Sequence, residues 1–190
     1  NPSVGREQYG IDFSASNPTM LGDKLRLIYS RSEASNLISA SYNVPILPDG
    51  TAITGTIAYG QNKVITQPYR DLEIKSKATN WSIGINHPII NAATPESRFK
   101  FSVGFSYEGR KTQESLLGFN FPISAGSDND GRRNINTFTL SQNIEYKGKN
   151  QAFNLDSNID IGVDINTKTG PGFANNQAIS YRLNHEYVRK

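Results

Sequence analysis

Residues able to carry catalysis or bind a metal are few and widely spaced in this sequence. It has no cysteine, and its two histidines, His87 and His185, lie almost a hundred positions apart. Without cysteine there is no disulfide framework, thiolate metal site or thiol nucleophile. No ligand spacing connects the histidines, so we expect both to pack at strand ends or interfaces rather than to form a metal pair. The sequence therefore predicts no catalytic, cofactor-binding or metal site.

The carboxylates also argue against an active site. The run Asp-Asn-Asp-Gly at 128–131 begins like a calcium-binding loop, but the glutamate that would complete such a loop is missing. We expect a solvated turn there. Asp160 and Asp164 share one face of a predicted strand about 13 Å apart, which is too far for a cooperating carboxylate pair. No nucleophile has a base beside it, and we expect the protein not to be an enzyme.

Composition narrows the remaining classes. The 190 residues include 20 basic and 17 acidic ones, interspersed, which give a net charge of +3 and no basic stripe for nucleic acid. Mean hydropathy is -0.53, and no run of about 18 apolar residues exists, which excludes a helical membrane protein. A membrane β-barrel stays possible, because only every second strand residue faces lipid. The start at Asn1, without methionine or signal peptide, is expected of a mature protein or an excised piece.

Apolar and polar residues alternate in about nine runs, most regularly at 81–107. The arm from Phe99 to Tyr107 sets aromatic residues and valine against lysine, serine and glycine. Alternation with a period of two indicates β-strands. This arm would extend roughly 30 Å, and a tilt of about 45° would let it cover most of the apolar band of a membrane barrel. We therefore expect an all-β chain: an antiparallel, up-and-down transmembrane β-barrel, present as an incomplete segment of about nine strands.

The two faces of these runs differ in polarity. One face carries no charged residue, as lipid requires, since a charge at the bilayer midplane costs about 2 to 4 kcal/mol. A soluble sandwich also keeps its inner face uncharged, so this feature alone does not decide. The candidate lipid-facing residues are Phe13, Leu27, Ile57, Ile83, Phe101, Val103, Phe105, Leu140, Ile161, Val163 and Leu183. The candidate lumen-lining residues on the other face are Asp12, Lys24, Arg26, Lys100, Asp160, Asp164, Arg182 and Glu186.

The positions of aromatic residues and the lengths of the connections favour a membrane barrel over a soluble domain. Tyrosine and tryptophan are expected near strand ends, at the two membrane interfaces, because they have an apolar body and a polar tip. The candidate aromatic girdle is Tyr9, Tyr29, Tyr42, Tyr59, Trp81, Tyr107, Tyr146 and Tyr187. Long polar connections, expected at 61–80 and 109–134, alternate with short turns. The long ones would thus share one side of the membrane, as extracellular loops do.

Three motifs resemble the barrel of the two-partner-secretion transporters, the haemolysin-activator or TpsB-like type. Asn-Pro-Thr-Met-Leu-Gly-Asp at 17–23 is similar to the family's Asn-Pro-Leu-Gly-Leu-Gly-Asp turn, although Thr19-Met20 stands where the family usually has Leu-Gly. Ser-Ala-Ser-Tyr-Asn-Val-Pro at 39–45, followed by Asp-Gly-Thr at 49–51, resembles its Tyr-Ser-x-Pro and Asp-Gly pair. Ser-Ile-Gly-Ile-Asn-His-Pro-Ile-Ile at 82–90 resembles its next strand. The order and spacing of these motifs carry the resemblance.

The resemblance implies a non-enzymatic protein-translocating channel in the outer membrane of a Gram-negative bacterium. Its substrate would be a secreted partner exoprotein, and outer-membrane lipid would surround it. Members of the family have POTRA modules before a sixteen-stranded barrel whose later half supplies a Val-Arg-Gly loop. Neither feature occurs in residues 1–190, so we expect part of one barrel domain, about strands 2 to 10, without the remainder of its own barrel. Two alternatives stay open: a small porin or adhesin barrel, and a soluble carbohydrate-binding β-sandwich.

Overall fold

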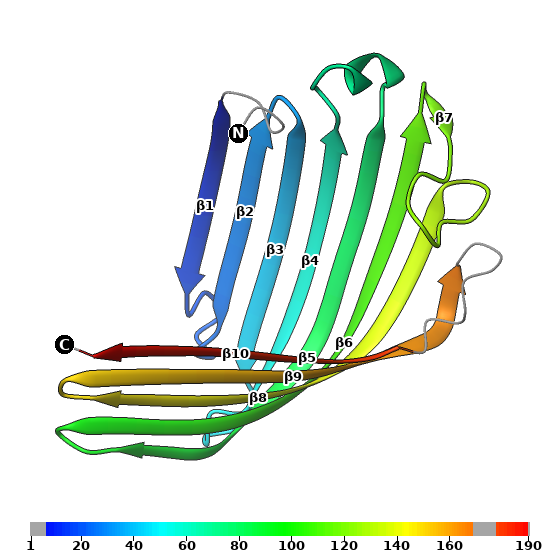
Figure 1. Ribbon diagram of the computed structural model, residues 1–190. Coiled ribbons are helices and arrows are strands. Elements are labelled where there is room, and N and C mark those ends of the chain that lie inside the picture. Colours follow the sequence, from blue (N-terminus) through cyan, green and yellow to red (C-terminus); the bar gives the residue numbers. More distant parts are fainter. Residues whose placement is uncertain (1–6, 169–177, 190) are drawn as a thin grey trace.

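The computed structural model describes residues 7–168 and 178–189, with side chains described for 7–163 and 178–189. They form a single open, curved sheet of antiparallel strands (Figure 1). Among these residues, no helix is long and apolar enough to cross a membrane. The elements are β1 (Gln8–Ser16), β2 (Lys24–Ser32), β3 (Ser35–Pro45), β4 (Ala52–Lys63), the 3-10 helix η1 (Tyr69–Leu72), β5 (Lys75–Ala93), β6 (Ser97–Leu116), β7 (Phe119–Asn120), β8 (Arg132–Gly148), β9 (Gln151–Lys168) and β10 (Ile179–Arg189).

The strands follow one another across the sheet in chain order. The order is β1-β2-β3-β4-β5-β6-β8-β9-β10, and the two-residue β7 pairs only with β6. This up-and-down arrangement confirms the predicted all-β, antiparallel fold. Within the described residues, β1 pairs only with β2 and β10 only with β9, so both edges of the sheet are open, as expected of an incomplete barrel. The β-sandwich alternative is wrong, because the strands form one sheet instead of two packed layers.

Four strands are longer than their alternation predicts. β5, β6, β8 and β9 have 19, 20, 17 and 18 residues, whereas β1 to β4 have 9 to 12. The long connections predicted at 61–80 and 109–134 are present but shorter than predicted. β4 continues to Lys63 and β5 begins at Lys75, while β6 continues to Leu116 and β8 begins at Arg132. Backbone pairing continues there with polar residues on both faces, which removes the alternation signal. Trp81 and Tyr107 consequently lie inside their strands and not at the ends.

The apolar face of the sheet has no covering layer. Within the described residues, Ala34 is the only buried apolar residue, while Phe13, Ile57 and Ile83 remain 53%, 56% and 56% exposed. A soluble domain buries such side chains between two layers of secondary structure. This sheet instead requires another apolar medium against its outer face.

The register of the strands sets their slope. One continuous row of opposed residues joins Ala15, at the short-turn end of β1, to Ile179, at the long-connection end of β10. The row crosses eight strand spacings, about 38 Å in all. Over that width it passes from one end of the apolar band to the other, which is a displacement along the strands of about 26 Å, the length of the band on β10. The ratio corresponds to strands tilted by about 35°, within the range of closed barrels.

Candidate functional site: the polar concave face

Strand pairing assigns each predicted residue to a face, since directly opposed residues lie on the same side of a sheet. Phe13 opposes Leu27, Ile83 opposes Tyr107, and Phe105 opposes Leu140. Continued across the sheet, the register places all the candidate lipid-facing residues and the whole candidate aromatic girdle on one face. Their contact with lipid stays a prediction.

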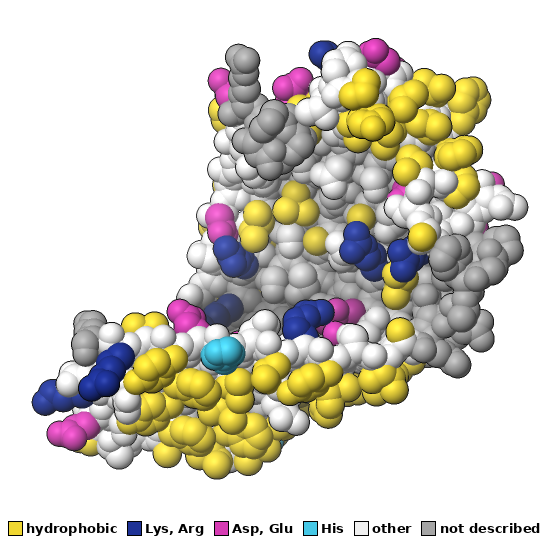
Figure 2. Space-filling model, viewed as in Figure 1, with side chains coloured by type: hydrophobic (Ala, Val, Ile, Leu, Met, Phe, Trp, Pro, Cys, Tyr) yellow, Lys and Arg dark blue, Asp and Glu magenta, His cyan; other side chains and the backbone are white. Residues whose placement is uncertain are grey.

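The candidate lumen-lining residues lie on the opposite, concave face. Asp12, Lys24, Arg26, Lys100, Asp160, Arg182 and Glu186 all have this orientation in the register. The side chain of Asp164 lies outside the described residues. Figure 2 shows basic and acidic side chains gathered in the hollow of the sheet, and apolar ones over the outer surface of β8 to β10. The concave face of the sheet is therefore polar and charged, and the outer face is apolar.

Two ion pairs join neighbouring strands on the concave face. Arg26 of β2 binds Asp12 of β1 through both carboxylate oxygens, with Nε–Oδ1 at 3.0 Å and Nη2–Oδ2 at 2.5 Å. Arg182 of β10 lies 3.4 Å from Asp160 of β9. The Asp160 carboxylate also accepts hydrogen bonds from Thr139 at 2.8 Å and Ser180 at 3.2 Å. These carboxylates are thus already partnered within the wall.

An amide and carboxylate cluster continues this pattern. Asn143 Nδ2 of β8 donates to Asn154 at 3.0 Å and to Asp156 at 2.6 Å, and Asn154 Nδ2 donates to Asp156 at 2.7 Å. Each side chain in the cluster has a hydrogen-bond partner within it, so the Asp156 carboxylate is not an isolated charge. The wall offers water and a passing solute many weak hydrogen-bonding groups.

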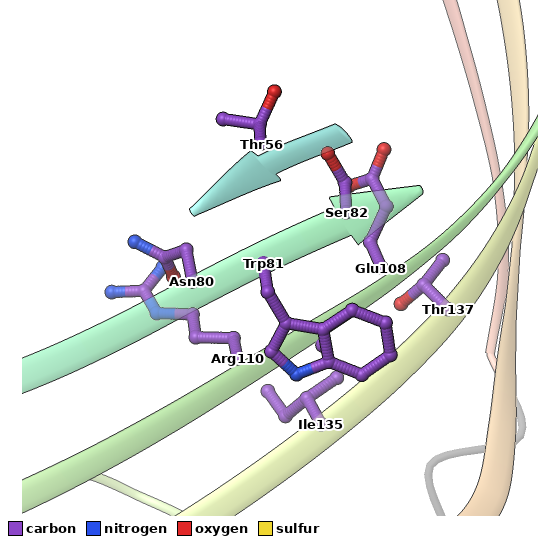
Figure 3. A pocket seen from close by; sticks show the side chains of 9 residues that line it. Thr56, Asn80, Trp81, Ser82, Glu108, Arg110, Ile135 and Thr137 are labelled. Atoms are coloured by element: carbon purple, nitrogen blue, oxygen red, sulfur yellow. The ribbon is translucent and has the colours of Figure 1, made fainter. Parts of the chain in front are cut away.

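A hollow of about 340 Å³ lies over the middle strands. In Figure 3, Thr56, Ser82 and Glu108 lie on one side of the sheet, and the Trp81 ring lies on the other. The residues that line the hollow are Thr56, Asn80, Trp81, Ser82, Glu108, Gly109, Arg110, Ile135 and Thr137. Glu108 accepts a hydrogen bond from Ser106 at 3.1 Å. This mixture of donors and acceptors suits polar contact more than a defined reaction.

Sequence reasoning missed the residue that holds the longest connection in place. Glu114 is 6% exposed and lies on the concave side, beyond the apolar band. Its carboxylate accepts hydrogen bonds from the amides of Ile123 and Ser124 at 3.0 and 2.8 Å, from Ser127 Oγ at 3.1 Å, and from Ser124 Oγ. Glu114 therefore fastens the connection 117–131 to the concave side of β6 through residues 123–127. Burial alone would raise the pKa of Glu114, but these hydrogen bonds outweigh it and hold the pKa below its usual range.

The short turns contain two further polar contacts between motifs that are separate in the sequence. Asp23, fully buried, accepts hydrogen bonds from Tyr42 Oη at 2.7 Å and from the Thr19 amide at 3.2 Å. His87 Nδ1 lies 2.7 Å from Thr51 Oγ1 and 3.8 Å from Asp49. The run 17–23 thus binds the strand at 35–45, and the run 49–51 binds β5.

The Asp-Asn-Asp-Gly run at 128–131 forms a turn that its own carboxylate closes. Asp128 Oδ1 accepts hydrogen bonds from the amides of Asp130 and Arg132 at 3.0 and 2.7 Å. Among the described residues, no group of three histidines, aspartates or glutamates is placed to hold a metal ion. The predicted absence of a cofactor stays a prediction.

These observations define a segment of an up-and-down β-barrel with an apolar outer face and a polar concave face. Comparison with known proteins bears on the fold. No protein-family model matches the chain, and no curated protein matches it. CdiB from Escherichia coli is similar in structure, with a TM-score of 0.74 and 16% identity over 97% of this chain and 34% of the CdiB chain.

The chain thus spans about a third of the length of CdiB. BamA from Haemophilus ducreyi lacking POTRA domains 1–3 gives a TM-score of 0.40 at 14% identity, over 89% of this chain and 41% of that one. At 16% identity, the similarity to CdiB establishes the fold of this chain, which is that of part of the CdiB chain.

Proposed function

We propose that this chain is part of the wall of an outer-membrane channel that passes a partner exoprotein, in unfolded form, to the surface of a Gram-negative bacterium. The observation that carries the proposal is the opposite polarity of the two faces: an uncovered apolar face and a concave polar one. The similarity to CdiB, a two-partner-secretion transporter, supports this class of channel. The three sequence motifs quoted above support it independently.

The concave face suits the passage of an extended polypeptide. The carboxylates of Asp12, Asp156 and Asp160 are paired with arginine, asparagine, serine or threonine, so a moving chain meets hydrogen-bonding groups there instead of isolated carboxylates. A backbone that leaves water needs partners for its amide and carbonyl groups, and a wetted polar wall supplies them. The function needs no bond to be made or broken, and we propose that the protein is not an enzyme.

The open edges require additional strands. In lipid, an unpaired strand edge leaves amide and carbonyl groups without partners, at a cost of several kcal/mol for each group. We infer that the remainder of the same barrel pairs with β1 and β10, and that outer-membrane lipid covers the apolar face. Together these would enclose the concave face as a lumen.

Site-specific photo-crosslinking tests the proposal. A benzoylphenylalanine residue would replace Ser82, which faces the concave side of β5, or its neighbour Ile83, which faces outward. During secretion, we expect crosslinks to the exoprotein from position 82 and none from position 83. Thr56 and Ile57 of β4 provide a second matched pair. Equal crosslinking from both faces, or from neither during active secretion, would contradict the proposal.

A solute channel of the porin type is the second candidate. The segment 117–131, which Glu114 holds against the concave face, favours it, because a loop in that place narrows an opening. A porin would conduct small ions steadily in a planar bilayer and would give no exoprotein crosslink at position 82. Crosslinking at position 82 would exclude it as the main function.

A further inference from the structure

Positive side chains gather on the outward face just beyond the apolar band, at the end where the long connections lie. In β5, Lys77 lies two outward positions before Trp81. In β6, Lys111 lies two outward positions after Tyr107. Arg132 begins β8 on the same face. We call Lys77, Lys111 and Arg132 the basic cluster.

The register brings these three cations around one residue. Gln113 of β6 is directly opposite Lys77 on one side and Arg132 on the other, and Lys111 is its neighbour on the same face of β6. Arg132 Nε donates to Gln113 Oε1 at 3.1 Å. Three adjacent strands span about 10 Å, a distance that the flexible stems of lysine cover easily. The cluster can therefore present several donors to a single anionic group.

The charged strand positions at this end of the outward face are all basic within the described residues. Asp130 lies 3.6 Å from Arg132 Nη1, but Lys77 and Lys111 are exposed and form no ion pair within the part of the chain that the structure describes. Outward strand positions at this end also include Arg31, Lys63 and Lys75, of which Lys75 pairs with Glu73 at 3.2 Å. In the described ranges, none of these strand positions is an aspartate or glutamate.

The opposite end of the same face lacks this charge. Near the short turns, the outward strand positions within residues 8–163 and 179–189 include one cation, Arg189 of β10. Their other members are apolar, aromatic or uncharged, such as Phe99, Tyr146 and Phe153. The positive field is therefore confined to one border of the apolar band.

We propose that the basic cluster binds the phosphate groups of anionic lipids in the leaflet at the long-connection end of the barrel. The cluster continues directly from the apolar band, so one lipid can lay its acyl chains beside Trp81 and Tyr107 and its phosphate among the cations. Ammonium and guanidinium groups form strong, charge-assisted hydrogen bonds with phosphate. A basic residue near an anionic membrane surface strengthens binding about fivefold. This lipid binding requires only that the apolar outward face contacts lipid, and it does not depend on protein secretion.

The test uses the detergent-solubilised full-length protein and native mass spectrometry of bound lipid. The probes are dioleoyl phosphatidic acid, dioleoyl phosphatidylcholine and inorganic phosphate. The variant Lys77→Gln/Lys111→Gln/Arg132→Gln removes the cluster. The control Arg98→Gln/Lys147→Gln/Lys149→Gln removes the same charge from the short-turn end of β6 and β8. We expect phosphatidic acid to bind more tightly than phosphatidylcholine, about tenfold or more weakly to the cluster variant, and within about twofold of normal to the control.

Three results would overturn the inference: equal binding of the two lipids, equal losses in the two variants, or displacement of phosphatidic acid by millimolar inorganic phosphate. The last would indicate a free-anion site instead of a membrane contact. Heat-dependent gel mobility checks that both variants keep a folded barrel. A secretion assay on the unmutated protein is read separately, so absence of secretion together with the expected lipid binding would count against the transport proposal alone.

Discussion

The indole ring of Trp81 in β5 lies directly over the backbone of Gly109 in β6. A β-carbon at position 109 would lie 2.3 Å from the ring atoms Cε2 and Nε1. The ring also makes an edge contact with Tyr107, with centroids 5.1 Å apart. An aromatic side chain that covers a strand glycine on the neighbouring strand protects the ladder and helps to fix its register.

Gly109→Ala is expected to displace the Trp81 ring from Tyr107 and to lower the free energy of unfolding by about 1 to 3 kcal/mol, the usual cost of overpacking. Urea titration in detergent micelles measures the loss, and the fluorescence of Trp81 reports the displacement. Gly55→Ala is the matched control, because it lies in β4 on the same face with no atom within 4 Å of the added carbon. Equal effects of the two substitutions would show that Trp81 does not depend on the glycine.

Tyr42→Phe is expected to destabilise the turn at 17–23 by about 1.5 to 3 kcal/mol, because the buried Asp23 carboxylate loses a hydrogen bond that nothing replaces. Thermal unfolding in micelles measures this change. Tyr29→Phe is the control. Tyr29 of β2 lies on the same face of the sheet as Tyr42, and its hydroxyl has no hydrogen bond in the described structure. A loss for Tyr29→Phe as large as that for Tyr42→Phe would place the effect in the membrane interface and not in the Asp23 contact.

Glu114→Gln is expected to release residues 117–131 from the concave face. A glutamine offers one acceptor oxygen to the amides of Ile123 and Ser124 and turns a donor toward them, at a cost of about 1 to 3 kcal/mol. Hydrogen exchange of the amides in 117–131 measures the release. Glu108→Gln serves as control, because Glu108 accepts a hydrogen bond from Ser106 alone in the described structure. Unchanged exchange in Glu114→Gln would contradict the anchoring role.

The same contact gives a pH dependence of defined sign. Because folding lowers the pKa of Glu114, its ionised form stabilises the fold. This contribution is complete above the ordinary value of 4.5 and disappears as the pH falls through the lowered folded pKa. Amide exchange in 117–131, corrected for intrinsic rates, should therefore accelerate under acid in the natural protein. Glu114→Gln should not show this acceleration.

Gly131→Ala is expected to disrupt the same segment more strongly than Gly118→Ala. Both glycines have positive φ, 68° and 81°, so each substitution carries the cost of about 1 to 2 kcal/mol for a left-handed residue. At position 131, the added carbon would also lie 2.6 Å from the Phe121 carbonyl oxygen and 2.7 Å from that of Glu114, whereas position 118 is open. Limited proteolysis of 117–131 compares the two variants, and equal sensitivity would contradict the close packing at Gly131.

Alternation predicted the strands wherever one face is apolar, as at Phe99–Tyr107, and it failed where both faces are polar. β6 continues through Lys111 and Gln113 because backbone hydrogen bonds need no apolar face, only a paired neighbour. The sequence pattern carries no record of that pairing. Single-residue alternation also placed the candidate lipid-facing and lumen-lining residues on opposite faces, since a period of two is enough to assign sides.

The contacts that hold turns and connections could not be predicted in the same way. Asp23 and Tyr42 belong to separate motifs, and their contact depends on the register in which Leu25 opposes Tyr42. Glu114 reaches amides around nine residues further along the chain through a loop whose path no spacing rule describes. Such contacts arise from tertiary geometry, which is absent from a one-dimensional pattern.

The slope of the row from Ala15 to Ile179 constrains how the barrel can close. The apolar band moves along the register by about one residue for each strand, so a closed wall of this slope must return to its starting strand displaced by about as many residues as it has strands. The shear number, which is this displacement counted in residues around a closed barrel, would therefore be close to the number of strands. In the proposed complete barrel, a segment that joins the edges of β1 and β10 would therefore have to continue the tilt of the described strands and meet them in the register that this slope sets.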